Sequence, residues 1–190
     1  MKNKFPNNGA QAPSPVSAAK PADSSYKRNL PHIEEAEKTY FVTFTTRDRW
    51  ILPDEARSLV LQTCLHEHGD RLQIHGLVVM PDHVHMVFTP LLDASGNPFR
   101  LASILQGIKG VSAHRINRSL NQRGSIWQDE SFDRMLRSDE KIYEKVEYIC
   151  ANPIRKRIAQ NIEDYPWIWR EWIEGKKQAD TGGGACAPSI

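Results

Sequence analysis

Two histidines separated by one residue are the first side chains of this 190-residue chain whose spacing suits chemistry. His83 and His85 lie in MPDHVHM at 80–86, where the sequence predicts a strand. Alternate residues of a strand point to the same face, so both imidazoles face one side and Val84 faces the other. Two imidazoles on one face can bind a single divalent metal ion. Because such a pair more often has no function, it needs support from elsewhere in the chain.

A tyrosine and an asparagine four residues apart form the second candidate. Tyr148 and Asn152 lie in YICANP and share a helix face, since residues i and i+4 are neighbours on a helix. Asn152 offers an amide oxygen, a hard ligand suited to Mg²⁺ or Mn²⁺. Tyr148 offers a phenol, which becomes a nucleophile only with the help of a cation or a base. Packing of the tyrosine and helix capping by the asparagine are the alternative roles.

Cationic and aromatic residues are interleaved in a third segment, residues 100–137. The whole chain has a net charge of only +2, but this segment carries seven Lys and Arg against three acidic residues. The cations that we expect to contact DNA are Lys109, Arg115, Arg118, Arg123, Arg134 and Arg137. With Trp127 and Phe132 among them, they suit a nucleic acid with unpaired bases that can stack. A solvated helix face with a core tryptophan is the alternative.

Alternating strand and helix patterns position these residues. The sequence predicts strands at 40–46, 72–80, 83–89 and 131–137, and helices at 53–69, at 101–120 and from Ser138 to Pro153. This β-α-β-β-α-β order predicts an α+β, ferredoxin-like (RRM-like) sandwich with an additional C-terminal helix that carries the candidate catalytic tyrosine, Tyr148. The apolar run at 72–80 indicates a strand covered on both faces. We therefore expect the last helix to cover the face that bears the histidines.

Composition sets the domain organisation and the broad class. Residues 1–35 hold five of the twelve prolines, which predicts a disordered leader. We expect residues 36–174 to form the folded domain and residues 175–190 to form a disordered tail. No apolar stretch approaches the ~20 residues of a membrane-spanning helix. The N-terminus lacks the apolar core of a signal peptide, so a cytoplasmic location is expected. Three cysteines are too few for a disulfide scaffold or a Cys-rich zinc site.

Four segments taken together resemble a known family. They are HGLVVMPDHVHMVFTP at 75–90, IWQDESFDRMLR at 126–137, EYICANPIRKRI at 147–158 and DYPW at 164–167. The chain is similar to the single-tyrosine HUH transposases, and among them most similar to the REP-associated tyrosine transposases. The resemblance covers about residues 36–170. One departure is the segment 154–158, which is more basic than the usual apolar and Gly-rich continuation.

The resemblance implies a metal-dependent endonuclease and strand transferase. Such enzymes cleave and rejoin single-stranded DNA at hairpin-forming palindromic repeats through a covalent 5′-phosphotyrosine. It implies that Tyr148 is the nucleophile and that His83, His85 and Asn152 bind Mg²⁺ or Mn²⁺. The rival tyrosine, Tyr143, lies about 140° away around the helix. A monomer is favoured over a dimer, and neither a nucleotide cofactor nor a membrane partner is expected.

Two other functions remain open from the sequence. The same fold could serve as a binding module for hairpin DNA or RNA without cleaving it, because ferredoxin-like sheets often bind single strands. Alternatively, an unrelated metalloenzyme could use the two histidines to hold zinc, although Cys and carboxylate partners near His83 are scarce.

Overall fold

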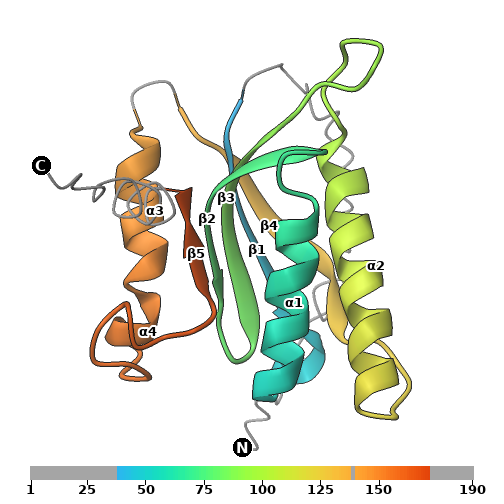
Figure 1. The fold of residues 1–190 in the computed structure, drawn as a ribbon, viewed down its shortest axis with the longest axis vertical. Coiled ribbons are helices and arrows are strands. Elements are labelled where there is room, and N and C mark those ends of the chain that lie inside the picture. The colour runs from blue at the N-terminus through green and yellow to red at the C-terminus, as the bar shows by residue number, and fades with distance from the viewer. Residues whose placement is uncertain (1–37, 138–139, 172–190) are drawn as a thin grey trace, which may run out of the picture. The chain divides into compact units, whose positions relative to one another are not determined.

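The computed structural model describes residues 38–137 and 140–171, which form an antiparallel sheet with helices on both faces (Figure 1). The strands are β1 (Tyr40–Thr46), β2 (Leu72–Val79), β3 (His83–Pro90), β4 (Trp127–Met135) and β5 (Ile168–Arg170). The helices are α1 (Asp54–His66), α2 (Leu101–Ser119), α3 (Ile142–Cys150) and the short α4 (Asn152–Arg155), with a 3-10 turn, η1 (Arg47–Arg49). Within the described ranges, no helix is both long enough and apolar enough to cross a membrane.

The sheet order is β4-β1-β3-β2-β5, and all neighbouring strands are antiparallel. Strands β4, β1, β3 and β2, with α1 and α2 on one face of them, confirm the predicted ferredoxin-like sandwich. The fourth strand begins at Trp127, earlier than expected, and ends at Met135. β5 was not predicted. The expected helix start at Ser138 and the expected domain limits at 35/36 and 174/175 lie outside the described residues.

The larger apolar core lies between the sheet and the layer of α1 and α2. It includes the side chains of Phe44, Met86 and Ile108, which are fully buried. Trp127 is buried in it as well, and its indole nitrogen donates a hydrogen bond to Ser112 Oγ at 3.0 Å. The core role of this tryptophan, one of the two alternatives from the sequence, is therefore confirmed.

A smaller core lies on the opposite face, under α3. Val78 and Val87 of the sheet meet Val146 and Ile149 of the helix, and all four are fully buried. The helix ends at Cys150, and α4 follows with Pro153 in its first turn, where the missing N–H of proline costs no helical hydrogen bond. The last helix thus covers the second face of the sheet, as expected from the apolar run in β2.

The segment after α4 is fixed by the DYPW motif at 164–167. The Tyr165 hydroxyl donates a hydrogen bond to the carbonyl of Val79 at 2.9 Å and accepts one from Arg57 at 3.2 Å. The Arg57 guanidinium also lies over the Trp167 ring, 3.6 Å from its centroid. These contacts hold the chain against α1 and β2, and they lead it into β5 at the outer edge of β2.

A bulge and a glycine in β2 allow α3 to lie close to the sheet. The register between β2 and β3 shifts between Ile74 and Gly76, so His75 is an extra residue in the strand. A Cβ atom added to Gly76 would lie 2.5 Å from Cγ1 of Val146, far inside van der Waals contact. The absence of a side chain at Gly76 therefore sets the height of α3, and of its tyrosine, above the strands.

We expect Gly76→Ala to destabilise the protein by about 1–3 kcal/mol, the usual cost of overpacking a well-filled site. Val146 is β-branched and stiff, so the helix must shift to make room. Urea unfolding curves measure the change. Gly110→Ala is the matched control, because a Cβ there meets nothing within 4 Å, and alanine in a helix gains about 0.5–1 kcal/mol over glycine. Equal stability of Gly76→Ala and the wild type would contradict the close approach.

Candidate active site

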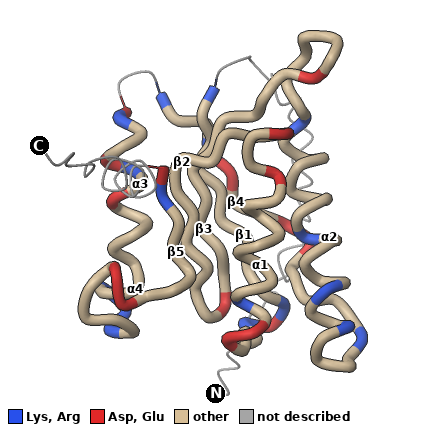
Figure 2. Tube along the Cα trace, viewed as in Figure 1, with Lys and Arg blue, Asp and Glu red and all other residues tan. Residues whose placement is uncertain are grey.

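The sheet separates the six cations that were expected to contact DNA. Lys109, Arg115 and Arg118 lie on α2 and Arg123 just after it, in the helical layer on the face away from α3. Figure 2 shows basic positions near the C-terminal end of α2. Arg115 donates to Gln62 Oε1 at 2.8 Å and thereby links α2 to α1. Lys109 donates to the carbonyl of Asp129 at 2.9 Å and links α2 to the strand β4.

Arg134 and Arg137 belong to the other side of the molecule. Arg134 is paired with Phe41 in the β1–β4 register, which places it on the face covered by α3, and its guanidinium donates to the Glu140 carboxylate at 2.6 Å. Arg137 is exposed just beyond β4. The predicted basic segment is therefore two surfaces, and DNA contact by either remains a prediction.

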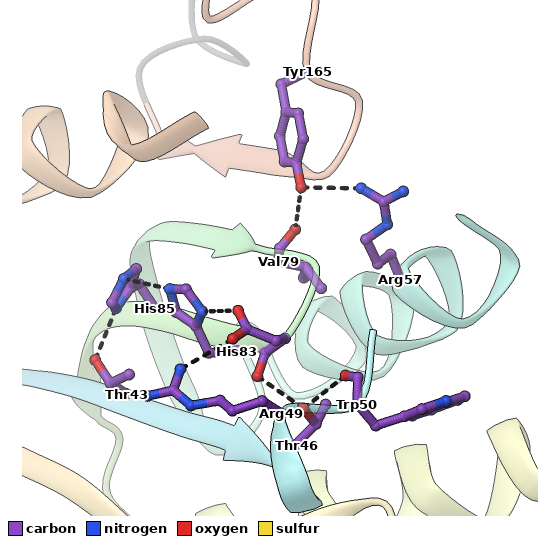
Figure 3. A network of polar contacts seen from close by, with 10 residues as sticks. Thr43, Thr46, Arg49, Trp50, Arg57, Val79, His83, His85 and Tyr165 are labelled. Atoms are coloured by element: carbon purple, nitrogen blue, oxygen red, sulfur yellow. Dashed lines mark hydrogen bonds and ion pairs between the residues drawn. The ribbon is translucent and has the colours of Figure 1, made fainter. Parts of the chain in front are cut away.

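The two histidines converge on β3. Both side chains are partly buried, and their Nε2 atoms lie 3.1 Å apart (Figure 3). An octahedral ion with bonds of about 2.1 Å holds two adjacent ligand atoms about 3 Å apart. The two nitrogens therefore stand at the spacing that a divalent ion requires, and the residues present fit a metal site.

Each histidine has a partner on its other ring nitrogen. His83 Nδ1 donates to Asp82 Oδ1 at 2.5 Å, since an ionised carboxylate can only accept, and Nε2 is the ring nitrogen that faces His85. His85 Nδ1 lies 2.8 Å from the Thr43 hydroxyl, which can either donate or accept. The threonine can therefore support the tautomer that bonds to His83 and also the one that frees Nε2 for a metal ion.

The charge states of these groups suit metal binding. Burial lowers the pKa of His85 to about 3, and the nearby charges of His83 and Arg155 act in the same direction. His85 is therefore neutral near pH 7, as a metal ligand must be. Burial raises the pKa of Asp82, but the hydrogen bonds and charges of His83 and Arg49 outweigh it and lower the pKa overall. The Asp82 carboxylate is therefore ionised.

Arg155 joins Tyr148 to Asn152. Its guanidinium lies 4.0 Å from the centroid of the Tyr148 ring, and its Nη2 donates to Asn152 Oδ1 at 2.6 Å and to the carbonyl of Tyr148 at 2.9 Å. Tyr148 is 53% exposed, whereas Asn152 is buried. The sequence marked 154–158 only as an unusually basic stretch; the structure makes Arg155 the residue that orders this end of the helix.

The Asn152 amide is only half satisfied. Its oxygen is bonded to Arg155, while its Nδ2 is buried and has no hydrogen-bond partner within the described part of the chain. Turning the amide over would set its NH₂ against the donors of Arg155, so it does not relieve the mismatch. The amide oxygen has two lone pairs and Arg155 occupies one of them, so a metal ion at this oxygen would use the other.

Asp82 and Thr43 were missed as partners of the histidines by the sequence analysis. Asp82 directly precedes His83, and this adjacency was the available signal. Thr43 lies forty residues earlier, on a strand whose register with β3 places it opposite His85. Nothing in its sequence neighbourhood indicates that pairing.

Comparison with known proteins identifies the family. The family model described as "Transposase IS200 like" matches residues 37–152, which include both histidines, Tyr148 and Asn152. The chain belongs to this family. It is similar to a Haemophilus influenzae protein assigned as a REP-associated tyrosine transposase, with 26% identity over 138 residues, 67% of this chain and 77% of the relative.

A solved structure shares the fold. It is a REP-associated tyrosine transposase bound to a REP hairpin, and it superimposes with a TM-score of 0.57 at 20% sequence identity. The match covers 73% of this chain and 80% of that chain. At this identity the likeness establishes the fold, which agrees with the predicted class.

Proposed function

We propose that this chain is a metal-dependent, single-stranded DNA endonuclease and strand transferase of the REP-associated kind. It acts at hairpin-forming repeat sequences through a covalent 5′-phosphotyrosine on Tyr148. The observation that carries the proposal is the convergence of two histidine nitrogens at 3.1 Å on the face covered by the helix that bears this tyrosine. Membership of the transposase family and the hairpin bound by the structural relative support it.

The metal site consists of His83, His85 and the Asn152 oxygen. A divalent ion held there supplies Lewis-acid polarisation of the scissile phosphate. Asp82 and Thr43 orient the two imidazoles through their second nitrogens.

Tyr148 performs the transfer. Its phenolic oxygen forms a bond to phosphorus as the bond from phosphorus to the 3′-oxygen breaks. The phenol proton passes to water, and the departing 3′-oxygen takes one up. Because the new phosphotyrosine retains the energy of the phosphodiester, attack by a 3′-hydroxyl rejoins DNA without ATP. Arg155, beside the phenol ring, offers its remaining N–H donors to the phosphate oxygens.

A denaturing gel tests the proposal directly. The purified full chain is mixed with end-labelled hairpin oligonucleotides from the repeats that flank its gene, with Mn²⁺ or with EDTA. We expect label at the mass of the protein with Mn²⁺ and none with EDTA. Cleaved DNA without any protein-bound label would argue for hydrolysis by water and against the tyrosine.

A catalytically silent binding module is the second candidate. The cationic Arg155 guanidinium on the Asn152 oxygen favours it, since a positive charge bonded to the expected third ligand opposes a metal ion there. Retarded mobility of the same hairpins in a native gel, with neither cleavage nor adduct in Mn²⁺ or Mg²⁺, would establish this function in place of the first.

A further inference from the structure

A row of aromatic rings and cations crosses the part of the histidine face next to α3. Phe132 of β4 lies 6.1 Å from Phe41 of β1, ring centroid to ring centroid. Lys145 Nζ of α3 lies 5.3 Å from the Phe41 centroid and 5.4 Å from that of Tyr148. Phe41 also stacks on His85, with centroids 5.7 Å apart and planes at 27°. The row thus leads from the edge strand to both the nucleophile and the metal site.

Strand register places Phe132 on this face. It is paired with Thr43, whose hydroxyl contacts His85, so the two side chains and the histidine lie on one side of the sheet. Met135, three residues later on β4, is paired with Tyr40 and lies on the opposite side. The position of Phe132 is therefore fixed by the pairing of β4 with β1 and does not depend on a flexible loop.

The ring of Phe132 is unusually open for its size and for its place in a sheet. It is 57% exposed and belongs to neither apolar core, and its ring contact is the edge-to-face one with Phe41. A single exposed aromatic residue is ordinary on a protein surface. This one is distinguished by its neighbour Lys145, whose ammonium group lies beside the adjoining Phe41 ring on the same face.

The alternation of rings and cations matches one class of ligand. A single strand of DNA presents flat base surfaces, which stack on aromatic side chains, and phosphates, which pair with cations. An apolar peptide would not need the cations, and a duplex offers no free base faces. The row also ends at the tyrosine that attacks a phosphate in the proposed function.

We infer that Phe132, in edge-to-face contact with Phe41, is the stacking platform for an unpaired base of single-stranded DNA close to the phosphate that Tyr148 attacks. Lys145 holds a phosphate between that base and the tyrosine. This inference rests on the proposed function, which supplies the DNA strand and its direction toward Tyr148.

Fluorescence of a base analogue tests the platform without requiring cleavage. The probe is the same hairpin oligonucleotide with 2-aminopurine at successive unpaired positions, bound to the full chain in EDTA; stacking on a ring quenches this base. In the wild type we expect quenching at one or two adjacent positions. Phe132→Ala is expected to abolish it and to weaken binding about tenfold, within the range for loss of one stacked base.

Three matched variants separate stacking from packing. Phe132→Trp keeps a flat ring and is expected to keep both quenching and affinity. Phe132→Leu keeps an apolar contact for Phe41 but cannot stack a base, so it is expected to behave like the alanine variant. Met135→Ala removes an apolar side chain from the same strand on the opposite face, and it should bind like the wild type. Thermal unfolding curves confirm that each variant is folded.

The outcomes distinguish this inference from the proposed function. Normal quenching and affinity in Phe132→Ala, with adducts still formed by the wild type in Mn²⁺, would refute the platform and leave the nuclease standing. Quenching that depends on Phe132 in a protein that forms no adduct would support the platform and remove the nuclease. Absence of quenching at every position in the wild type would also overturn the platform.

Discussion

Tyr148→Phe is expected to lower the yield of covalent protein–DNA adduct by at least about a thousandfold, as loss of a covalent nucleophile does elsewhere. The substitution removes only the hydroxyl. The ring remains, so its contacts with the Arg155 guanidinium and Lys145 are retained, and the exposed site leaves no buried cavity. Hairpin affinity in a native gel should therefore be unchanged while the labelled band on the denaturing gel disappears.

Tyr143→Phe is the matched control, because it makes the same change on the same helix, on a side chain that is also exposed. Tyr143 lies five residues earlier and about 140° around the helix, so it does not share the face of Tyr148. It should form adducts at the wild-type rate. The reverse result, with adducts lost in Tyr143→Phe and kept in Tyr148→Phe, would move the nucleophile to Tyr143.

His85→Ala is expected to weaken Mn²⁺ binding by at least about a hundredfold, since loss of even an outer-shell partner of a metal ligand costs about 10–100-fold. With this imidazole gone, the remaining donors are His83 and an Asn152 oxygen that already accepts a hydrogen bond from Arg155. Binding is measured from the electron paramagnetic resonance signal of free Mn²⁺, without DNA, so the readout does not depend on cleavage.

His114→Ala is the control for this measurement, because His114 is exposed on α2, in the layer on the far side of the sheet. It should bind Mn²⁺ like the wild type. Unfolding curves are recorded for both variants, as His85 also stacks on Phe41. If His85→Ala retains full Mn²⁺ affinity while folded, the histidine pair is not the metal site.

The sequence was sufficient for the four strands of the ferredoxin-like sandwich and for the shared face of the two histidines. The strands expected at 40–46, from its aromatic and β-branched residues, and at 83–89 are present as β1 and β3, and the spacing of His83 and His85 placed both on one face. β5 was missed because three residues, Ile168–Arg170, are too few to show a period. The paired residues of its partner, β2, lie 90 to 94 positions earlier, and the anchoring of Tyr165 on Val79 brings the chain back to that strand.

The candidate site was only partly predictable for a different reason. Residue types and spacing identify donors, but hydrogen-bond partners depend on how side chains meet across strands. Thr43 meets His85 through strand register, and Arg155 reaches Asn152 because a second short helix follows the first. The basic segment was treated as one surface because charge was counted along the chain, whereas the sheet places Arg115 and Arg134 on opposite sides.

The unequal division of the apolar core between the two faces of the sheet has a consequence for motion. In the described part of the chain, twenty-one buried side chains form the core under α1 and α2, whereas eight form the core under α3. Elements held by few buried contacts open locally at a lower free energy than the whole domain unfolds. The helix that carries Tyr148 is therefore the element that can lift away while the sheet stays folded. Under the function proposed above, a DNA end linked to Tyr148 would travel with this helix, and one strand end would exchange for another without unfolding of the domain.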